Sequence, residues 1–222
     1  DVDLQEFPNL VGMFDHCVNQ YAANPAVSCL GHTLSYADLD RLSAQFACYL
    51  QEHSGLQAGD RIAIQMPNIL QYPVVLFGAL RAGMIVVNTN PLYSERELKH
   101  QLNDSGAKAI VVLANIAETA AAVVGDTGVG TVIVTEVADL HPPVKRTLIN
   151  SVLKYVRKEV PSVKFKNSIS FRKALAKGSS KQYQKAAPDL EALALLQYTG
   201  GTTGVSKGAM ISHRNLMANV LQ

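Results

Sequence analysis

Cysteine is scarce in this chain of 222 residues, and its three cysteines, Cys17, Cys29 and Cys48, follow no metal-ligand spacing. An odd count in a chain without a visible secretory signal favours reduced thiols in a cytosol over a disulfide framework. Cys17 and Cys48 fall among apolar positions of helical period, so we expect them to be buried structural thiols.

Long apolar runs and paired histidines are also absent. The longest runs, such as Val74 to Leu80, are far shorter than a membrane span. The chain opens with acidic residues rather than a basic segment and an apolar core, so no signal peptide is visible, although a trimmed N-terminus would give the same picture. The six histidines include no H-x-x-x-H or H-E-x-x-H pair, and we interpret His16, His53 and His100 as surface or packing residues. Together these absences predict a cytoplasmic protein.

The formal net charge of +2 hides a strong division of charge. Residues 141–187 hold twelve of the twenty Lys and Arg but one of the eighteen acids, Glu159, so the segment carries +11 and the remainder −9. Aromatic residues make up 6% of the chain and do not interleave with the basic ones. The acidic remainder and this lack of interleaving argue against nucleic acid as a partner.

The most informative stretch is a short run of glycines, three threonines and a lysine. It consists of Tyr198, Thr199, Gly200, Gly201, Thr202, Thr203, Gly204, Val205, Ser206, Lys207 and Gly208. Glycines let the backbone approach a ligand closely, successive N–H groups can form an anion-binding concavity, and hydroxyl and ammonium groups donate to phosphate oxygens. The order differs from a Walker A motif and from a Rossmann fingerprint. The stretch predicts a polyphosphate-binding loop, and its alternative is a flexible turn between two strands.

Hydrophobic periodicity predicts strands that alternate with helices. The expected strands are Arg61–Met66, Met84–Val87, Ala109–Leu113, Thr131–Thr135, Ala192–Tyr198 and Gly208–Ser212. The expected helices follow caps at Asn9, Ser35, Ser94, Asn115 and Ser212, and a further helix covers Ile69–Arg81. This order indicates βαβ units, hence an α/β fold with a mostly parallel sheet and helices on both faces.

Composition changes divide the chain into three predicted segments. Residues 1–140 form an N-terminal α/β subdomain, 141–187 a basic, irregular connector, and 188–222 the start of a second, β-rich subdomain that carries the phosphate loop. Pro142-Pro143 and Pro188-Asp189 mark the two boundaries. Within the connector, residues 148–160 have the pattern of an amphipathic helix, with apolar residues on one face and basic residues on the other.

The phosphate loop resembles that of the adenylate-forming, AMP-binding enzymes, which include acyl-CoA synthetases, firefly luciferase and peptide-synthetase adenylation domains. Two earlier stretches match further motifs of that family in order: Leu34–Leu39, with Asp38 where Glu is usual, and Leu80–Asn88. Asn90–Leu98 is similar to the acyl-CoA synthetase branch. From about residue 10 onward the chain most resembles the N-terminal part of bacterial long-chain fatty-acid–CoA ligases.

This resemblance implies ATP-dependent activation of a long-chain fatty acid to acyl-AMP, followed by transfer to coenzyme A. It assigns the backbone of Thr199 to Gly204 and the hydroxyls of Thr202 and Thr203 to phosphate binding, and Lys207 to the catalytic stabilisation of departing pyrophosphate. Tyr198 is expected to pack at the end of its strand. The family's adenine, ribose and Mg²⁺ contacts, its late lysine and most of the acyl pocket lie further along a longer chain. We therefore expect this chain to be an incomplete fragment, inactive by itself.

Two alternatives stay open at this point. The first is an adenylate-forming ligase for a medium-chain or aryl acid, because nothing here defines an acyl pocket. The second is a non-catalytic module that binds an anionic membrane surface through residues 144–160. The same helix could hold a ligase peripherally on the cytoplasmic face of a membrane. Its alternative is to pack its apolar face on the protein body.

Overall fold

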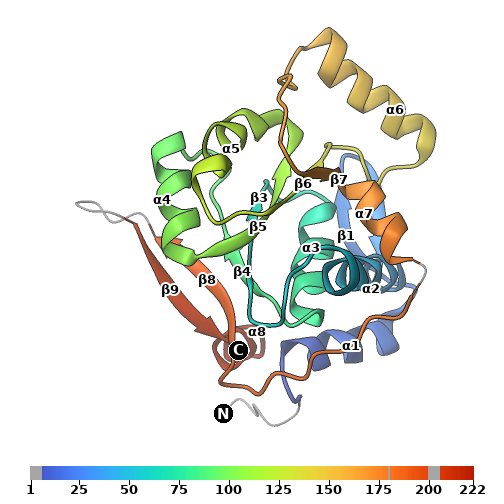
Figure 1. The fold of residues 1–222 in the computed structure, drawn as a ribbon. Coiled ribbons are helices and arrows are strands. Elements are labelled where there is room, and N and C mark those ends of the chain that lie inside the picture. The colour runs from blue at the N-terminus through green and yellow to red at the C-terminus, as the bar shows by residue number, and fades with distance from the viewer. Residues whose placement is uncertain (1–6, 180, 200–205) are drawn as a thin grey trace.

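The computed structural model describes residues 7–179, 181–199 and 206–222. Figure 1 shows a twisted central sheet between two layers of helices, with one helix, α6, standing apart. The strands are β1 (Pro25–Cys29), β2 (His32–Ser35), β3 (Arg61–Gln65), β4 (Ile85–Asn88), β5 (Ala107–Leu113), β6 (Thr131–Thr135), β7 (Ser168–Ser170), β8 (Leu193–Thr199) and β9 (Lys207–Ser212). The α-helices are α1 (Leu10–Tyr21), α2 (Tyr36–His53), α3 (Gln71–Arg81), α4 (Glu95–Ser105), α5 (Ala117–Val123), α6 (Pro143–Ser151), α7 (Phe171–Gly178) and α8 (His213–Val220).

Seven strands form one sheet in the order β7-β6-β5-β3-β4-β8-β9. All neighbours run parallel except β8 and β9, which are antiparallel. Parallel strands that are covered on both faces need apolar side chains on both, which explains the continuous run Ala109–Leu113 in β5. The predicted α/β fold with a mostly parallel sheet and helices on both faces is confirmed.

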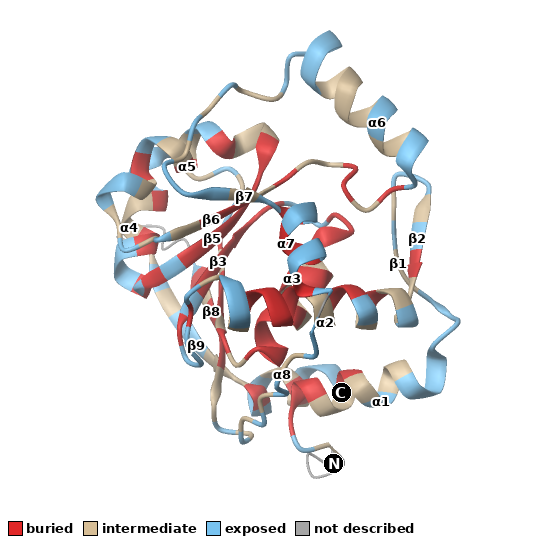
Figure 2. Ribbon diagram, turned by 45° about the vertical axis from the view of Figure 1, so that its right-hand side comes forward, coloured by how far each residue is buried: buried red, intermediate tan, exposed pale blue. Residues whose placement is uncertain are grey.

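Alternate residues of the strands supply two separate cores. On one face, Ile62, Val86 and Val111 pack with α1, α2, α3, α7 and α8. On the other, Val87 and Ile110 pack with α4 and α5. The buried residues in Figure 2 gather along the sheet and the helix sides that face it. Each face therefore has its own helical layer, as the period of two along a strand requires.

Most predicted helix starts are confirmed by side-chain caps. Asn9 caps α1, and Ser35, Ser94 and Ser212 each form a reciprocal capping box. The capping box predicted at Asn115 is wrong. A short 3₁₀ turn, Ala114–Ile116, follows β5, and α5 begins after it at Ala117 without a side-chain cap. The strand thus runs directly into the turn and leaves no extended residue at Asn115 to serve as a cap.

The basic segment 141–187 is more ordered than an irregular connector. It contains α6, a π-helical turn η3 (Val152–Val156), strand β7 and helix α7. β7 pairs with β6, and α7 packs so closely on α2 that a Cβ at Gly178 would overlap the carbonyl of Gln45. The prediction of an irregular structure for this whole segment is therefore wrong, because tertiary packing orders its second half.

Residues beyond Pro188 extend the same sheet. β8 pairs with β4, and β9 pairs with β8 at the sheet edge. The division of the chain into three domains stays a prediction, but the described part of 188–222 is joined to the central sheet by backbone hydrogen bonds. The β1–β2 hairpin was not predicted. Its two-residue turn uses positive φ at Leu30 and Gly31, and leucine is a weak sequence signal for that conformation.

A buried guanidinium joins three helices on one face of the sheet. Arg81, at the end of α3, is 2% exposed. Its Nη2 donates to Asp15 of α1 at 2.8 Å and to Asp40 of α2, while its Nη1 donates to the Ser43 hydroxyl of α2 at 2.8 Å. Burial by itself disfavours the charged form, but the hydrogen bonds that Arg81 donates to Asp15 and Asp40 outweigh it and raise the pKa of Arg81. The ring of Phe14 lies 4.7 Å from the guanidinium carbon.

We expect Arg81→Met to lower the free energy of unfolding by about 3 kcal/mol, because it leaves two carboxylates without their buried partner. The matched control is Arg41→Met, which removes an exposed ion pair with Asp38 and should cost less than about 1 kcal/mol. Urea denaturation of the 222-residue chain measures both. Equal, small losses would show that the Arg81 cluster does not hold the helices together.

Candidate functional site

The order of the strands places a crevice between β3 and β4. From β3 the chain moves to β4 on one side, and then returns to β5 on the other side of β3. Ligands of open α/β sheets bind at such a reversal, beside the carboxyl ends of the strands. A pocket of about 280 Å³ lies there. Its lining residues are Ile64, Met66, Tyr72, Asn88, Thr89, Asn90, Pro91, Gln197 and Tyr198.

A chain of polar side chains crosses this pocket. The Tyr72 hydroxyl donates to Asn88 Oδ1 at 2.8 Å, and Asn88 Nδ2 donates to Gln197 Oε1 at 3.0 Å. Gln101 of α4 donates to the Asn88 carbonyl at 2.8 Å. Burial raises the pKa of Tyr72, so its phenol stays protonated and acts as a donor. This network fixes the amide of Asn88 at the mouth of the crevice.

Sequence reasoning missed Tyr72 and Gln197 as site residues. A local signal did exist for two members of the network. Asn88 and Gln197 are polar residues at or near the carboxyl ends of otherwise apolar strands, where parallel strands present side chains to a ligand. Tyr72 carries no such signal, because its place depends on how α3 packs against the sheet.

The predicted phosphate loop leaves β8 and returns through β9. Thr199 is the last residue of β8, and it pairs with Lys207, the first residue of β9. The structure thereby brings both ends of the motif together, next to the crevice. Lys207 is exposed at this point. The remaining predicted members lie outside the described residues: Gly200, Gly201, Thr202, Thr203, Gly204 and Val205.

Helix α4 contacts both ends of the loop. The Tyr198 hydroxyl, just before the loop, donates to Asp104 Oδ2 at 2.5 Å. His100 Nε2 lies 3.1 Å from the carbonyl oxygen of Ser206, just after the loop, and because a carbonyl only accepts, this nitrogen is the donor. The prediction that His100 is an ordinary surface or packing residue is therefore incomplete. His100 and Asp104 are four residues apart, so they share one face of α4.

Tyr198 packs as its sequence position predicted. Its ring is buried, and its side chain points to α4 through the bond to Asp104. Burial, followed by the hydrogen bond to Asp104, raises the pKa of the phenol, so it stays neutral. Opposite it on β9 stands Gly208, where a Cβ would come within 2.9 Å of the ring. A glycine at position 208 is therefore what allows the aromatic ring to lie beneath the base of the loop.

Gly208→Ala should lower the free energy of unfolding by roughly 1–3 kcal/mol, because the hydrogen bond to Asp104 keeps the Tyr198 ring from moving away. In a Tyr198→Leu background the same change should cost much less, giving a coupling of about 1 kcal/mol in a double-mutant cycle. Gly128→Ala is the control, since a Cβ there meets only a carbonyl oxygen at 3.7 Å. Additive effects of the Gly208 and Tyr198 changes would contradict this packing.

Within the residues that the structure describes, no group of three or more His, Cys, Asp or Glu side chains could hold a metal ion. The described geometry is thus that of a crevice lined by apolar and neutral polar residues, with the two ends of the glycine- and threonine-rich stretch and the exposed Lys207 beside it. Such an arrangement suits an uncharged or anionic ligand, and it contains no nucleophile held by a neighbouring base.

Comparison with known proteins gives consistent matches along the chain. A long-chain-fatty-acid–CoA ligase of Escherichia coli O157:H7 is 51% identical over 222 residues, which is all of this chain and 40% of that protein. The ligase of the same description from Bacillus subtilis is 34% identical over 196 residues, covering 87% of this chain and 34% of its own length. The chain thus spans about 40% of the length of the curated relatives it matches most fully.

Solved structures show the same fold. A long-chain-fatty-acid–CoA ligase from Archaeoglobus fulgidus matches with a TM-score of 0.70 and 24% identity over all of this chain and 41% of its own. A benzoate CoA ligase from Burkholderia xenovorans matches with a TM-score of 0.71 and 20% identity, over 95% of this chain and 36% of its own. A family model described as AMP-binding enzyme covers residues 14–222, and the chain therefore belongs to the AMP-binding enzyme family.

Proposed function

We propose that this chain supplies the phosphate-binding loop of an ATP-dependent ligase that activates a long-chain fatty acid, first to acyl-AMP and then to acyl-CoA. The observation that carries the proposal is identity of about half, along all 222 residues, to proteins described as long-chain-fatty-acid–CoA ligases. The described geometry supports it, because the two ends of the loop meet beside the switch-point crevice.

In the proposed first step a fatty carboxylate oxygen attacks the α-phosphorus of ATP. A new P–O bond forms, the bond to the β-phosphate oxygen breaks, and pyrophosphate leaves. Coenzyme A thiolate then attacks the acyl carbon and releases AMP. Anionic nucleophile and polyanion repel each other, so positioning and charge stabilisation must supply most of the catalysis, and no side-chain nucleophile is needed.

The residues of this chain have defined parts in the proposal. Backbone N–H groups from Thr199 to Gly204, with the hydroxyls of Thr202 and Thr203, hold the β- and γ-phosphates. Lys207 stabilises the negative charge that grows on pyrophosphate as it leaves. The contacts of α4 with Tyr198 and Ser206 hold the two ends of the loop in place, so that little reorganisation is needed when ATP binds.

The finer identity of cofactor and substrate also belongs to the proposal. ATP is expected to arrive with Mg²⁺, but the described residues offer no cluster of metal ligands, and no step here is routed through the ion. The likeness to anthranilate and benzoate ligases lies below 25% identity and supports the fold alone. The closer relatives favour a long-chain over a medium-chain or aryl acid, and the use of ATP and coenzyme A favours a cytoplasmic location.

We expect Lys207→Ala, in a full-length protein that contains this chain, to lower kcat for adenylate formation about 100-fold, as loss of one charge-stabilising donor does elsewhere. ATP–pyrophosphate exchange with palmitate measures that half-reaction. Thiolysis of supplied palmitoyl-AMP by coenzyme A should change much less. Equal losses in both half-reactions would mean that Lys207 supports folding and takes no direct part in the reaction.

A second part of the proposal concerns α6 and η3 as a membrane-contacting surface. Both elements stand away from the body, and neither contains a buried residue (Figure 2). Val144, Leu148 and Tyr155 are 84%, 63% and 69% exposed. Their spacing of four and seven residues places them along one exposed stripe of the helix.

Polar contacts hold this helix with its apolar stripe outward. Lys145 donates to the carbonyl oxygens of Leu30 and Gly31 in the β1–β2 turn. Asn150 accepts from the N–H of Ala138 at 3.0 Å and donates to Glu136. The alternative, in which the whole apolar face packs on the body, fits poorly, although Ile149, Val152 and Leu153 are half-buried.

The expected binding is interfacial. In the described parts of the chain, no helix combines the length and apolarity needed to cross a bilayer. Each Lys or Arg near an anionic surface contributes roughly 1 kcal/mol, and this attraction fades within a Debye length. Long-chain acids partition into membranes, so a ligase held reversibly at the surface would meet its proposed substrate there.

The 222-residue chain should co-sediment with liposomes that contain anionic lipid, and less so as salt is raised. Reversal of Lys154, Arg157 and Lys158 to Glu should abolish the binding, and Leu148→Ser with Tyr155→Ser should weaken it. Leu92→Ser is the control, because Leu92 is 87% exposed outside this helix. A wild-type chain that ignores anionic liposomes at low salt would make α6 and η3 a solvated projection only.

A further inference from the structure

A spacious cavity lies far from the two ends of the predicted phosphate loop. It has a volume of about 640 Å³, within the range of roughly 300–1,000 Å³ typical of small-molecule sites. It is lined by the start of α5, by β6, β7 and α7, and by the loop 160–165 that follows η3. Three strands separate β6 from β8, a distance of about 19 Å at ordinary strand spacing.

Most of the cavity wall is apolar. The apolar lining residues are Ala114, Ala117, Val134, Val160, Pro161, Val163, Phe165, Ile169 and Ala176. Two basic residues of the first turn of α7, Arg172 and Lys173, two acidic ones, Glu136 and Asp139, and two serines, Ser168 and Ser170, complete it. An adjoining pocket of about 290 Å³ beneath α6 shares Glu136, Asp139 and Arg172, and adds Arg146 and Lys154. The apolar cavity thus opens beside a polar space with more basic than acidic groups.

The acids at this opening already have hydrogen-bond donors. Asp139 Oδ2 accepts from the Thr135 hydroxyl at 3.0 Å and from the N–H of Glu136 at 2.9 Å. Burial raises the pKa of Asp139, which weakens its repulsion of an anion. The carboxylate of Glu136 accepts from Asn150. In the described part of the chain, neither Glu136 nor Asp139 forms a salt bridge.

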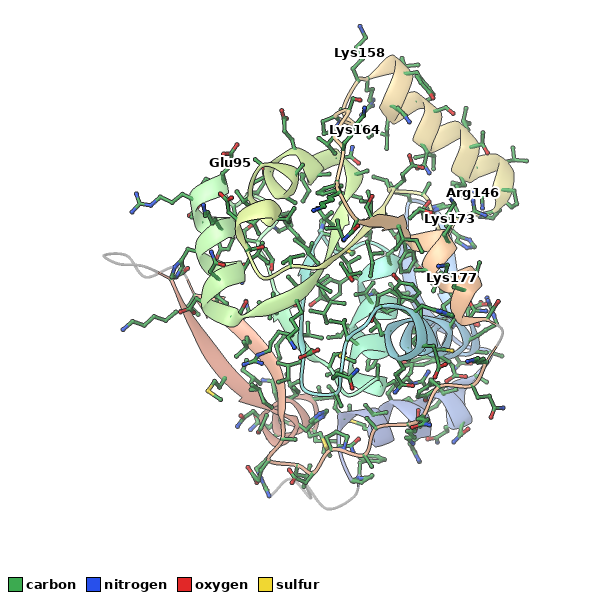
Figure 3. The ribbon with its side chains drawn as sticks, in the orientation of Figure 1. Glu95, Arg146, Lys158, Lys164, Lys173 and Lys177 are labelled. Atoms are coloured by element: carbon green, nitrogen blue, oxygen red, sulfur yellow. The ribbon has the colours of Figure 1, made fainter. Side chains whose placement is uncertain are left out.

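The basic residues at this opening form no close ion pairs with other described residues, although the charge of Arg172 acts on the nearby Asp139 carboxyl and opposes the rise in its pKa. Within the described ranges, none of Arg146, Arg172 and Lys173 forms a salt bridge with a carboxylate. Figure 3 shows Arg146, Lys158, Lys164 and Lys173 on the side of the molecule that carries α6 and α7. Cations that form no salt bridge, beside an apolar cavity, are complementary to a ligand with an anionic head and an apolar body.

We propose that this cavity is a second binding site, separate from the phosphate loop, for the anion of a single-chain fatty acid. The apolar wall between α5, β7 and the loop 160–165 takes the acyl chain, and Arg172 and Lys173 pair with the carboxylate. A nucleotide is disfavoured, because nine of the fifteen lining residues are apolar. The site adjoins η3, so an acid that leaves a membrane bound by α6 and η3 would reach this site first.

The proposal goes beyond the ligase activity and does not rest on it, since it concerns binding without ATP. Palmitate should bind the 222-residue chain with one-to-one stoichiometry in solution, without vesicles and below its aggregation concentration. Isothermal titration calorimetry gives both stoichiometry and Kd. Palmitate should bind more tightly than octanoate and than the uncharged hexadecanol, and ATP should not compete.

Charge reversal of both Arg172 and Lys173 to Glu should weaken palmitate binding roughly tenfold or more, since two partly exposed ion pairs are lost and replaced by repulsion. Lys164→Glu is the matched control, because Lys164 is exposed on the loop 160–165 but does not line the cavity. Ala176→Trp fills part of the cavity without changing charge and should also weaken binding. Circular dichroism confirms that each variant is folded.

Three outcomes would overturn the proposal. The first is palmitate binding that is unchanged in both the double charge reversal and Ala176→Trp, which would place the acid at the switch-point crevice. The second is displacement of palmitate by inorganic phosphate, or equal affinity for octanoate, which would make the site a simple anion site. The third is no saturable binding at all. The effect of Lys207→Ala on adenylate formation tests the proposed ligase function and does not bear on these three outcomes.

Discussion

The buried guanidinium of Arg81 is the interaction on which the arrangement of this chain most depends. A single side chain at the end of α3 accounts for the mutual positions of α1, α2 and α3, because its donors are shared among Asp15, Asp40 and Ser43. Those helices cover the same face of β3 and β4. The same helices pack against β3 and β4, whose carboxyl ends border the crevice.

The phosphate loop has a comparable dependence on a neighbour. Its glycines and threonines have little capacity to define one conformation, since glycine has the largest backbone freedom to lose. Helix α4 compensates through His100 and Asp104, which contact the chain on either side of the loop. The helix is itself well defined by the capping box at Ser94 and by Gly106 in the left-handed conformation at its end. A locally determined helix thus contacts the chain just before and just after the predicted phosphate loop.

The sequence predicted those parts of the fold that local patterns determine. Thr131–Thr135 is an apolar run whose strand has the same bounds in the structure, and Ser212 caps α8 as expected. β7 is only three residues long, which is too short to give a clear pattern. α7 buries Phe171 and Leu175, but these apolar residues stand among many basic ones, so the sequence did not indicate a buried helix face. At the site, the loop motif was visible, but the bond between Tyr198 and Asp104 joins residues 94 positions apart and has no local signal.

The division of charge along the chain now has a structural counterpart. The basic segment lies at the β7 edge of the sheet, and the strands β8 and β9, which the predicted phosphate loop connects, lie at the opposite edge. If the excess of basic residues served the polyphosphate, it should gather around the loop, where Lys207 is the exposed cation that the structure describes. It gathers instead around an apolar cavity and an outward-facing apolar helix. That placement is suited to an anion with a hydrophobic body, which a long-chain carboxylate is and ATP is not.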